Sequence, residues 1–258
     1  HFRLVLGYLD EGAPLMPRAN RFYVPGAVWH ITHRCHGRQF LLKFERDRLR
    51  WKYRLFEATK RYGLCVLNYI VTSNHIHLLV KDTGRSEVAR GMQLISGRTA
   101  QEYNQRKSRK GAFWEDRYVA TAVSTDRHLV QCLLYVDFNM VRTGVINHPA
   151  KWKVSGFHEI QSPPQRYKII NQQALCDLMK MHSLQALQEA HSNWVTEHLR
   201  VQHMKRQSCW TESIDVGSEA FVMQCKAQLG SRALYRTIEG GSGKIYKIQD
   251  GANLKPYL

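Results

Sequence analysis

Residues 64–81 read LCVLNYIVTSNHIHLLVK, two apolar runs of strand length joined by a three-residue polar link. A short polar connection between two such runs predicts an antiparallel hairpin. The second run carries His75 and His77 around an isoleucine. Because successive side chains of a strand point to opposite faces, both imidazoles project from the same side of the expected sheet. The hairpin therefore anchors the fold and raises the question of why a buried-looking strand holds two imidazoles.

Strand and helix patterns flank this hairpin on both sides. They predict strands over 27–34 and 113–123, and helices over 45–63, 86–109 and 127–144. The resulting order is strand, helix, strand, strand, helix, strand, helix. We therefore predict an α+β fold with the ferredoxin-like or RRM-like split βαββαβ arrangement, an antiparallel sheet with helices packed on it.

The remainder of the chain predicts a second region. Residues 148–165 read as a loop leaving the sheet unit, and 168–205 are mostly helical in pattern. The stretch 218–239 has the outline of two helices around Gly230, either a helix-turn-helix or a packed pair. GGSG at 240–243 predicts a flexible link before a short IYKI strand.

These patterns divide the chain into three parts. We expect a leader at 1–15 that is not part of the fold, a catalytic domain at 16–165, and a mostly helical extension at 166–258. The extension could bind DNA, dock over the active site or mediate self-association.

Charge is the strongest signal in the composition. The chain of 258 residues has 38 Lys and Arg against 21 Asp and Glu, a formal net charge of +17. Such an excess favours a polyanionic partner, and the alternative is a basic surface that serves only solubility. Six scattered cysteines without metal-site spacing, and no long apolar segment, indicate a cytoplasmic protein with no membrane contact.

The paired histidines could hold a divalent ion if a third ligand lies nearby. Tyr135 and Asn139 are four residues apart on the last predicted helix, so they share one face. An amide oxygen could complete a site with two imidazoles, and a tyrosine beside the ion could act as a nucleophile. Taken alone, the spacing of each feature favours a simpler reading, surface histidines and a core aromatic side chain.

The motifs taken together resemble a known family. HIH at 75–77, the helix with Tyr135 and Asn139, and the opening MPRANRFYVPGAVWHITHR resemble the HUH single-strand nucleases with one tyrosine. They are most similar to the REP-associated tyrosine transposases. GAFWEDRYVATAV, DRHLVQCLLYVDFNMVRTGVI and HPAKWKVSG extend the likeness over roughly residues 16–158.

This resemblance implies a metal-dependent endonuclease and strand transferase acting on single-stranded DNA at REP-type hairpins. Tyr135 matches the nucleophile that forms a 5′-phosphotyrosine link, while His75, His77 and Asn139 match the ligands of a divalent cation, Mg or Mn. Relatives act as monomers or homodimers, so Tyr135 could serve its own histidines or a partner's. The chain departs from the family at Met140, where Pro is usual, and we expect the helix to continue there.

A basic and aromatic cluster lies around the second predicted helix and the strand after it, and suits a groove that tracks a nucleic-acid backbone. An arginine-bearing amino-terminal arm could add contacts. The predicted DNA-binding residues are Arg18, Arg21, Arg34, Arg98, Arg106, Lys107, Arg109, Lys110, Trp114 and Arg117. For the neighbouring aromatic pair Phe113 and Trp114, the alternative is that one of them belongs to the sheet core.

Two other classes compete with the transposase reading. A non-catalytic protein that binds structured DNA or RNA would need the basic surface but not the tyrosine. A hydrolytic metalloenzyme for small substrates is disfavoured by the net charge and by the lack of a carboxylate near the histidines.

Overall fold

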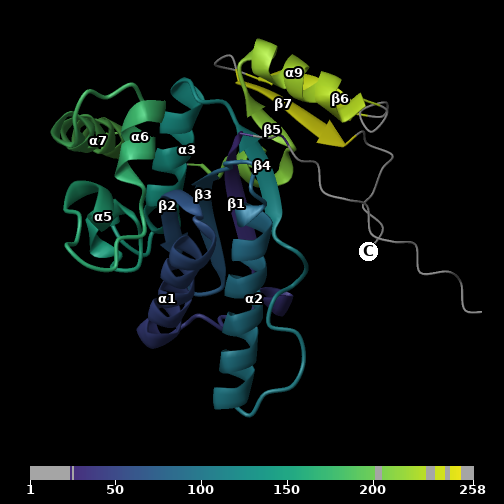
Figure 1. Ribbon diagram of the computed structural model, residues 1–258, viewed down its shortest axis with the longest axis vertical. Coiled ribbons are helices and arrows are strands. Elements are labelled where there is room, and N and C mark those ends of the chain that lie inside the picture. The colour runs from purple at the N-terminus through teal and green to yellow at the C-terminus, as the bar shows by residue number, and fades with distance from the viewer. Residues whose placement is uncertain (1–23, 25, 201–204, 231–235, 242–244, 251–258) are drawn as a thin grey trace, which may run out of the picture.

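One seven-stranded sheet organises the molecule, in the order β2-β3-β1-β4-β5-β7-β6 (Figure 1). The computed structural model describes residues 24, 26–200, 205–230, 236–241 and 245–250. The strands are β1 (Val28–Arg34), β2 (Cys65–Val71), β3 (His75–Lys81), β4 (Val119–Val123), β5 (Asp215–Gly217), β6 (Arg236–Gly241) and β7 (Ile245–Asp250). The helices are α1 (Glu45–Tyr62), α2 (Glu87–Arg106), α3 (Arg127–Asp137), α4 (Asn139–Arg142), α5 (Phe157–Gln161), α6 (Gln172–Leu178), α7 (Leu184–Leu199), α8 (Cys209–Glu212) and α9 (Glu219–Leu229), with 3-10 turns η1 (His36–Arg38) and η2 (Pro149–Lys151).

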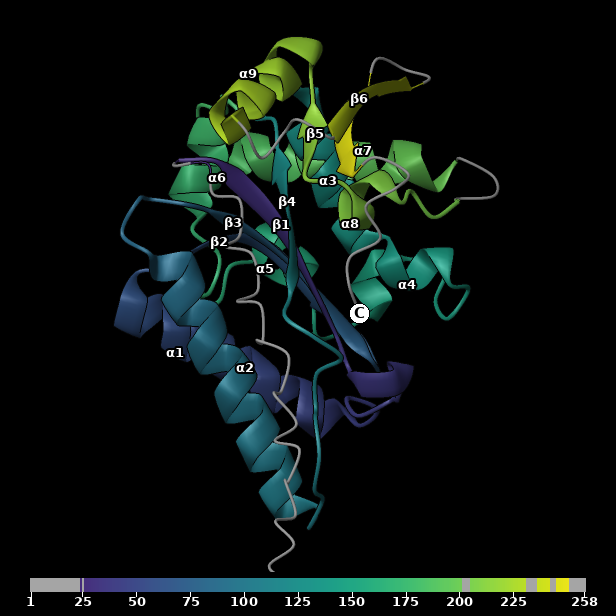
Figure 2. The same ribbon diagram turned by 90° about the vertical axis from the view of Figure 1, so that its right-hand side faces the viewer.

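The first four strands form the predicted split βαββαβ unit. β1 lies in the middle and pairs antiparallel with both β3 and β4, while β2 pairs with β3. Helices α1 and α2 cover one face of the sheet and α3 lies on the other (Figure 2). The α+β fold class is therefore confirmed, and the two imidazoles of β3 project toward the side of α3.

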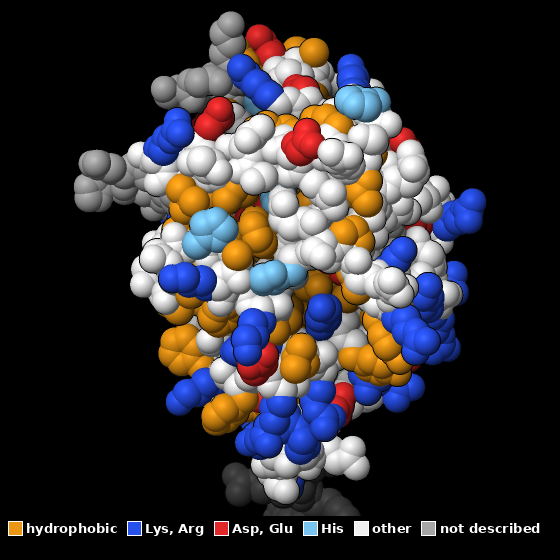
Figure 3. Space-filling model, turned by 90° about the vertical axis from the view of Figure 1, so that its left-hand side faces the viewer, with side chains coloured by type: hydrophobic (Ala, Val, Ile, Leu, Met, Phe, Trp, Pro, Cys, Tyr) orange, Lys and Arg blue, Asp and Glu red, His pale blue; other side chains and the backbone are white. Residues whose placement is uncertain are grey.

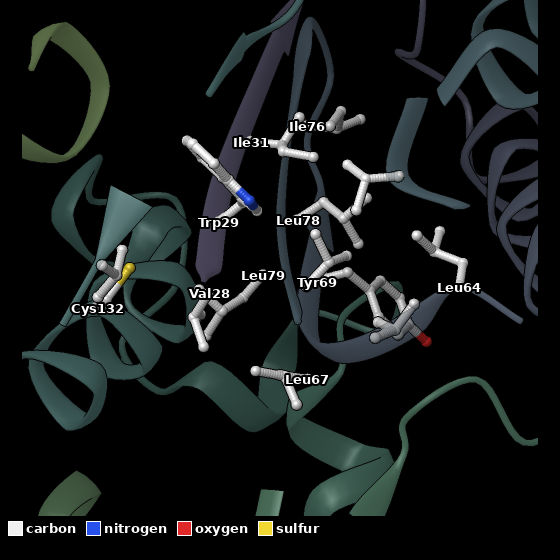
Figure 4. Close-up of a cluster of buried hydrophobic side chains, with 14 of the residues drawn as sticks. Val28, Trp29, Ile31, Leu64, Leu67, Tyr69, Ile76, Leu78, Leu79 and Cys132 are labelled. Atoms are coloured by element: carbon white, nitrogen blue, oxygen red, sulfur yellow. The ribbon is translucent and has the colours of Figure 1, made fainter. Parts of the chain in front are cut away.

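The core explains why the hairpin strands are apolar on both faces. All seven residues of β2 are buried, because helices or loops cover the sheet on each side. In Figure 4, Ile76 and Leu78 lie on the side of β3 away from Cys132 of α3. Alternating side chains of each strand thus pack into an apolar layer on each face of the sheet. The two histidines of β3 take the place of apolar side chains in one of these layers.

The structure corrects two predicted boundaries near the site. The strand predicted over 113–123 begins only at Val119, and Trp114 makes an isolated bridge to Cys35. The helix predicted over 127–144 is observed as α3 and α4, which meet at Phe138. Helical hydrogen bonds still reach across Phe138, so Tyr135 and Asn139 keep the one-turn spacing that the sequence predicts.

Residues 148–165, predicted as a loop, contain a 3-10 turn and α5 and cover the outer edge of β2. Gly156 donates its N–H to the carbonyl oxygen of Tyr69 at 2.7 Å. A Cβ at this glycine would lie 2.3 Å from Oδ1 of Asn68, so only glycine allows the two backbones to approach this closely.

The extension contributes helices, as predicted, and also adds strands to the same sheet. β5 pairs in parallel with β4, and β7 pairs with β5 and β6. The IYKI strand is confirmed within β7, whereas the second helix after Gly230 is wrong, because Arg236–Gly241 is a strand. Part of the predicted GGSG link belongs to β6, and residues 242–244 lie outside the described residues, as do 1–15.

No helix within the described ranges is both long and apolar enough to cross a bilayer. This agrees with the absence of a long apolar run in the sequence.

Candidate functional site

A cavity of about 240 Å³ lies where β1, β3, α3, α4 and the segment around α8 meet. β3 supplies His75 and His77, α3 supplies Tyr135, and α4 begins with Asn139. The four side chains come from parts of the chain that are far apart in sequence, yet they line one space. The full lining is Thr32, Arg34, His75, His77, Tyr135, Asn139, Arg142, Thr143, Arg206 and Thr211.

The helix that carries Tyr135 is fixed at both ends. The Asp126 carboxylate accepts a hydrogen bond from the backbone N–H of His128 at 2.9 Å, the usual N-cap arrangement. At the other end, Asp137 is buried and hydrogen-bonded to the Asn68 amide at 2.9 Å. Tyr135 therefore sits on a rigid element, with only 6% of its surface exposed.

His75 presents a free lone pair to the cavity. Its Nδ1 lies 2.8 Å from Oδ1 of Asn74, an amide oxygen that can only accept. The proton therefore resides on Nδ1, and Nε2 faces the Asn139 amide nitrogen at 3.4 Å. His77 directs its Nε2 to that same amide nitrogen, at 2.9 Å.

The carboxamide of Asn139 is only partly satisfied. Its nitrogen faces the two imidazoles, but its buried Oδ1 has no hydrogen-bond partner in the described part of the chain. The oxygen and nitrogen of a carboxamide exchange places on a half-turn of the group. Rotation would bring Oδ1 between the two imidazole lone pairs, where a bound cation would satisfy all three acceptor atoms. Two nitrogens and one amide oxygen would then converge, a donor set that fits a divalent cation with coordination positions left over.

The electrostatics of the cavity favour an anion beside that cation. Arg34, Arg142 and Arg206 line it, and the lining contains no carboxylate. Burial, helped by these arginines, lowers the pKa of His75 to about 4, so the imidazole is neutral at ordinary pH. The described residues contain no group of three or more His, Cys, Asp or Glu arranged to hold a metal. Because His75, His77 and Asn139 are neutral donors, a phosphodiester beside a bound cation would supply the balancing negative charge.

Arg142 and Tyr135 face each other closely. The guanidinium carbon of Arg142 lies 3.9 Å from the centroid of the Tyr135 ring. Burial raises the pKa of the Tyr135 phenol, while the charges of Arg142 and Arg206 act in the opposite direction. An arginine held against a buried phenol can stabilise the phenolate and any charge that develops on an attached phosphoryl group.

Of the predicted DNA-binding residues that the structure describes, Arg34 alone lines the cavity. Arg98, Lys107, Lys110 and Arg117 are exposed elsewhere on the surface. Figure 3 shows Lys and Arg gathered toward the lower part of one side of the molecule. Arg18 and Arg21 lie outside the described residues.

Three other predicted contacts are engaged within the protein. Arg106 pairs with the buried Asp47, and Arg109 donates to the carbonyl oxygen of Ala112 at 2.9 Å. The ring of Trp114 stacks on His33 with centroids 4.0 Å apart, and its Nε1 donates to the Ser96 carbonyl oxygen at 3.0 Å. Both members of the aromatic pair at 113–114 thus pack into the protein, although Trp114 keeps partial exposure.

Several cavity residues were not predicted from the sequence. Thr32 alternates in phase with His30 in β1, so a search for polar side chains facing β3 could have found both. Arg142 lies one turn beyond Phe138 and a full two turns beyond Tyr135, which is also a detectable spacing. Arg206 and Thr211 come from the extension, and no local pattern marks them.

The chain is similar to one family model and to solved structures. Residues 23–138 match the model of the family described as transposase, IS200 like. A solved structure of a REP-associated tyrosine transposase bound to a REP hairpin is similar over 56% of this chain and 84% of its own, with 15% identity and a TM-score of 0.47. A candidate transposase from Deinococcus radiodurans R1 is similar over 47% of this chain and 96% of its own, with 18% identity and a TM-score of 0.34. No curated protein matches the chain.

Proposed function

We propose that this protein, whose residues 23–138 match the model of the IS200-like transposase family, cuts and rejoins single-stranded DNA beside REP-type hairpins through Tyr135. One observation carries the proposal. A buried tyrosine, two imidazole lone pairs and an unsatisfied amide oxygen share a basic cavity that holds no carboxylate. A core built only for stability would satisfy these polar atoms.

The proposed reaction has a cleavage step and a rejoining step, both at Tyr135. Tyr135 releases its proton to solvent, and its oxygen attacks a phosphorus of the DNA. The bond to the 3′ oxygen breaks, that oxygen takes up a proton, and the 5′ phosphate stays on Tyr135. In the rejoining step another 3′ hydroxyl loses its proton and its oxygen attacks the same phosphorus. The bond from phosphorus to Tyr135 breaks, and the phenolate, a better leaving group than an alkoxide, takes up a proton. Arg142 would stabilise the negative charge on the phenolate and the phosphoryl group.

The proposal includes a divalent cation, Mg or Mn. His75 and His77 would bind it through Nε2, and Asn139 through Oδ1. When bound, such an ion supplies Lewis-acid polarisation of a phosphoryl oxygen. Arg34 and Arg206 would hold the phosphates that flank the scissile one.

The other basic residues would act farther from the cavity. Exposed Arg98, Lys107, Lys110 and Arg117 would contact the DNA backbone without sequence preference. Replacing one of them should weaken binding and reduce its salt dependence while leaving the bound complex competent to cut.

The test is covalent trapping. The protein is incubated with end-labelled hairpin oligonucleotides carrying single-stranded flanks and Mg or Mn, then run on a denaturing gel beside Tyr135→Phe. We expect a labelled band at the protein's mass that disappears in the variant while hairpin binding persists. Tight binding with neither cleavage nor adduct on varied hairpins would instead favour the non-catalytic DNA- or RNA-binding protein.

A further inference from the structure

A third histidine lies behind the cavity. His30 of β1 is 1% exposed, and its ring lies parallel to that of His77, with centroids 5.0 Å apart and planes within 3°. Its Nε2 lies 2.9 Å from Nδ1 of His77. Its Nδ1 lies 2.6 Å from the carbonyl oxygen of Trp210. His30 is not part of the cavity lining, but its ring contacts two residues that are, His77 and Tyr135, the latter with centroids 5.9 Å apart.

The carbonyl of Trp210 sets the direction of every hydrogen bond in this series. A carbonyl oxygen can only accept, so His30 carries its proton on Nδ1. A neutral imidazole then offers a lone pair at Nε2, which accepts the Nδ1 proton of His77. His77 is left with its lone pair on Nε2, the nitrogen that faces Asn139 at 2.9 Å. The Asn139 amide can turn either its nitrogen or its oxygen toward this atom, so the hydrogen bond to His30 is the contact that decides which nitrogen of His77 is protonated.

The anchoring carbonyl belongs to the extension. Trp210 lies in α8, beyond the 23–138 stretch that matches the transposase family. Its side chain is fully buried, and its Nε1 donates to Oε1 of Gln207 at 2.6 Å. The Trp210 ring also lies 6.2 Å from that of Tyr135 between centroids. The carbonyl is therefore held in place by the packing of its own residue.

We propose that His30 is a positioning residue that fixes the tautomer of His77, and that the extension completes the cation site by orienting His30 through the Trp210 carbonyl. This inference rests on the proposed function, in which His77 is a cation ligand. Hydrogen-bonding partners of metal-binding histidines typically change metal affinity by about 10–100-fold when removed. A loss of that size is expected when His30 loses its acceptor nitrogen.

The first test needs neither metal nor activity. Nitrogen-15 NMR of the imidazoles in the full-length protein distinguishes a protonated ring nitrogen from one that bears a lone pair. We expect Nδ1 protonated and Nε2 unprotonated in both His30 and His77. In His30→Leu, we expect His77 to shift toward the Nε2-protonated form that a free imidazole favours. Finding His77 already protonated at Nε2 in the parent protein would overturn the inference.

Matched variants separate orientation from simple packing. In His30→Gln, the amide oxygen can accept from His77 and should restore the parent tautomer. Thr32→Val removes the other acceptor near His77 Nδ1, a hydroxyl at 3.3 Å, and should leave the tautomer unchanged. Equal disturbance of His77 by Leu and Gln at position 30 would indicate a packing role and count against the inference.

The second test measures cation affinity directly. Mn²⁺ binding is titrated by electron paramagnetic resonance with a bound hairpin oligonucleotide, in a Tyr135→Phe background that prevents cleavage. Adding His30→Leu should weaken binding by about 10–100-fold, and adding His30→Gln by much less. If Tyr135→Phe itself binds no Mn²⁺, the cation in the proposed function is wrong. If it binds Mn²⁺ and His30→Leu binds equally well, only the role of His30 is wrong.

Discussion

Two buried histidine clusters lie beside α3, and they differ in how completely their polar atoms are satisfied. In the cluster of His75, His77 and Asn139, two imidazole lone pairs face one amide and the Asn139 Oδ1 has no partner among the described residues. Around His191 and Asp137, each side-chain polar atom has a partner. We call the cluster of His75, His77 and Asn139 the open cluster, because it lines a cavity. We call the cluster of His191 and Asp137 the sealed cluster, because both side chains are fully buried.

The sealed cluster shows what a structural histidine looks like in this fold. His191 Nε2 lies 2.8 Å from an Asp137 oxygen, and both side chains are fully buried. Gln161 approaches the other imidazole nitrogen at 2.6 Å, and Asn68 donates to the second carboxylate oxygen. This cluster joins α7 to α3 and β2. Histidine and amide side chains thus serve both clusters, and unsatisfied atoms distinguish a candidate site from a structural contact.

The largest effect on activity is expected from removing both imidazoles of the open cluster. His75→Ala combined with His77→Ala should reduce covalent adduct formation by on the order of a thousandfold or more, because Lewis-acid stabilisation contributes several kcal/mol. Thermal unfolding of the same variant checks that it still folds, because His77 is buried and hydrogen-bonded to His30. An adduct yield within tenfold of the parent's would show that cleavage does not depend on a cation held by His75 and His77.

Breaking the sealed cluster should instead affect folding. His191→Leu leaves the Asp137 carboxylate buried without its partner, and removing one member of a buried pair costs about 3–5 kcal/mol. Urea unfolding measures this loss. Asp137→Asn added to His191→Leu should recover part of the stability, since no buried charge then remains. A variant as stable as the parent would contradict the assignment of this cluster to structure.

A change beside the nucleophile should give a smaller loss of activity. Arg142→Met removes the guanidinium over the Tyr135 ring, and loss of one donor that stabilises developing charge typically lowers rates by about 100-fold. The phenol pKa should rise further, so the rate should reach its plateau at higher pH than in the parent. Arg142→Lys should retain part of the rate. If Arg142→Met left the pH profile of the rate unchanged, Arg142 would not be the group that lowers the pKa of the Tyr135 phenol.

The smallest expected effect is on stability against acid. Burial lowers the pKa of His30 to about 4, compared with 6.5 for the exposed side chain. A depressed histidine pKa contributes stability that is complete above pH 6.5 and is lost as pH falls toward 4, because the unfolded chain binds the proton more readily. Between pH 6.5 and 4.5, the parent should lose about 2 kcal/mol more than His30→Gln. Equal slopes in urea unfolding at these pH values would contradict a neutral, buried His30.

The sequence predicts the residues of the open cluster, but not the contacts of His30 and the Trp210 carbonyl behind it. The hairpin at 64–81 and the four-residue spacing of Tyr135 and Asn139 depend on local periodicity, which a sequence displays directly. The anchor of His30 is a backbone carbonyl far along the chain, and a backbone group has no residue signature. Trp114 shows the other limit, because an aromatic side chain suits a DNA-stacking surface and a packed interior equally well.

The carboxyl-terminal strands went partly unpredicted for a similar reason. β5 has three residues, too short for an alternating pattern, and β6 ends in two glycines, which ordinarily weaken a strand. Both strands exist because neighbouring strands in the sheet supply their hydrogen bonds. Tertiary pairing therefore overrides the local preference of these residues.

The parallel pairing of β4 with β5 also sets an order of events during synthesis. β4 emerges from the ribosome and can join β1 at once, but its other edge waits until residues 215–217 have been made. An unpaired strand edge is a template for contacts with other chains, and the wait is longest when synthesis is slow. A nascent chain stalled before α8 would carry Tyr135 and both cavity histidines on a sheet with one open edge, prone to aggregate before its site is complete.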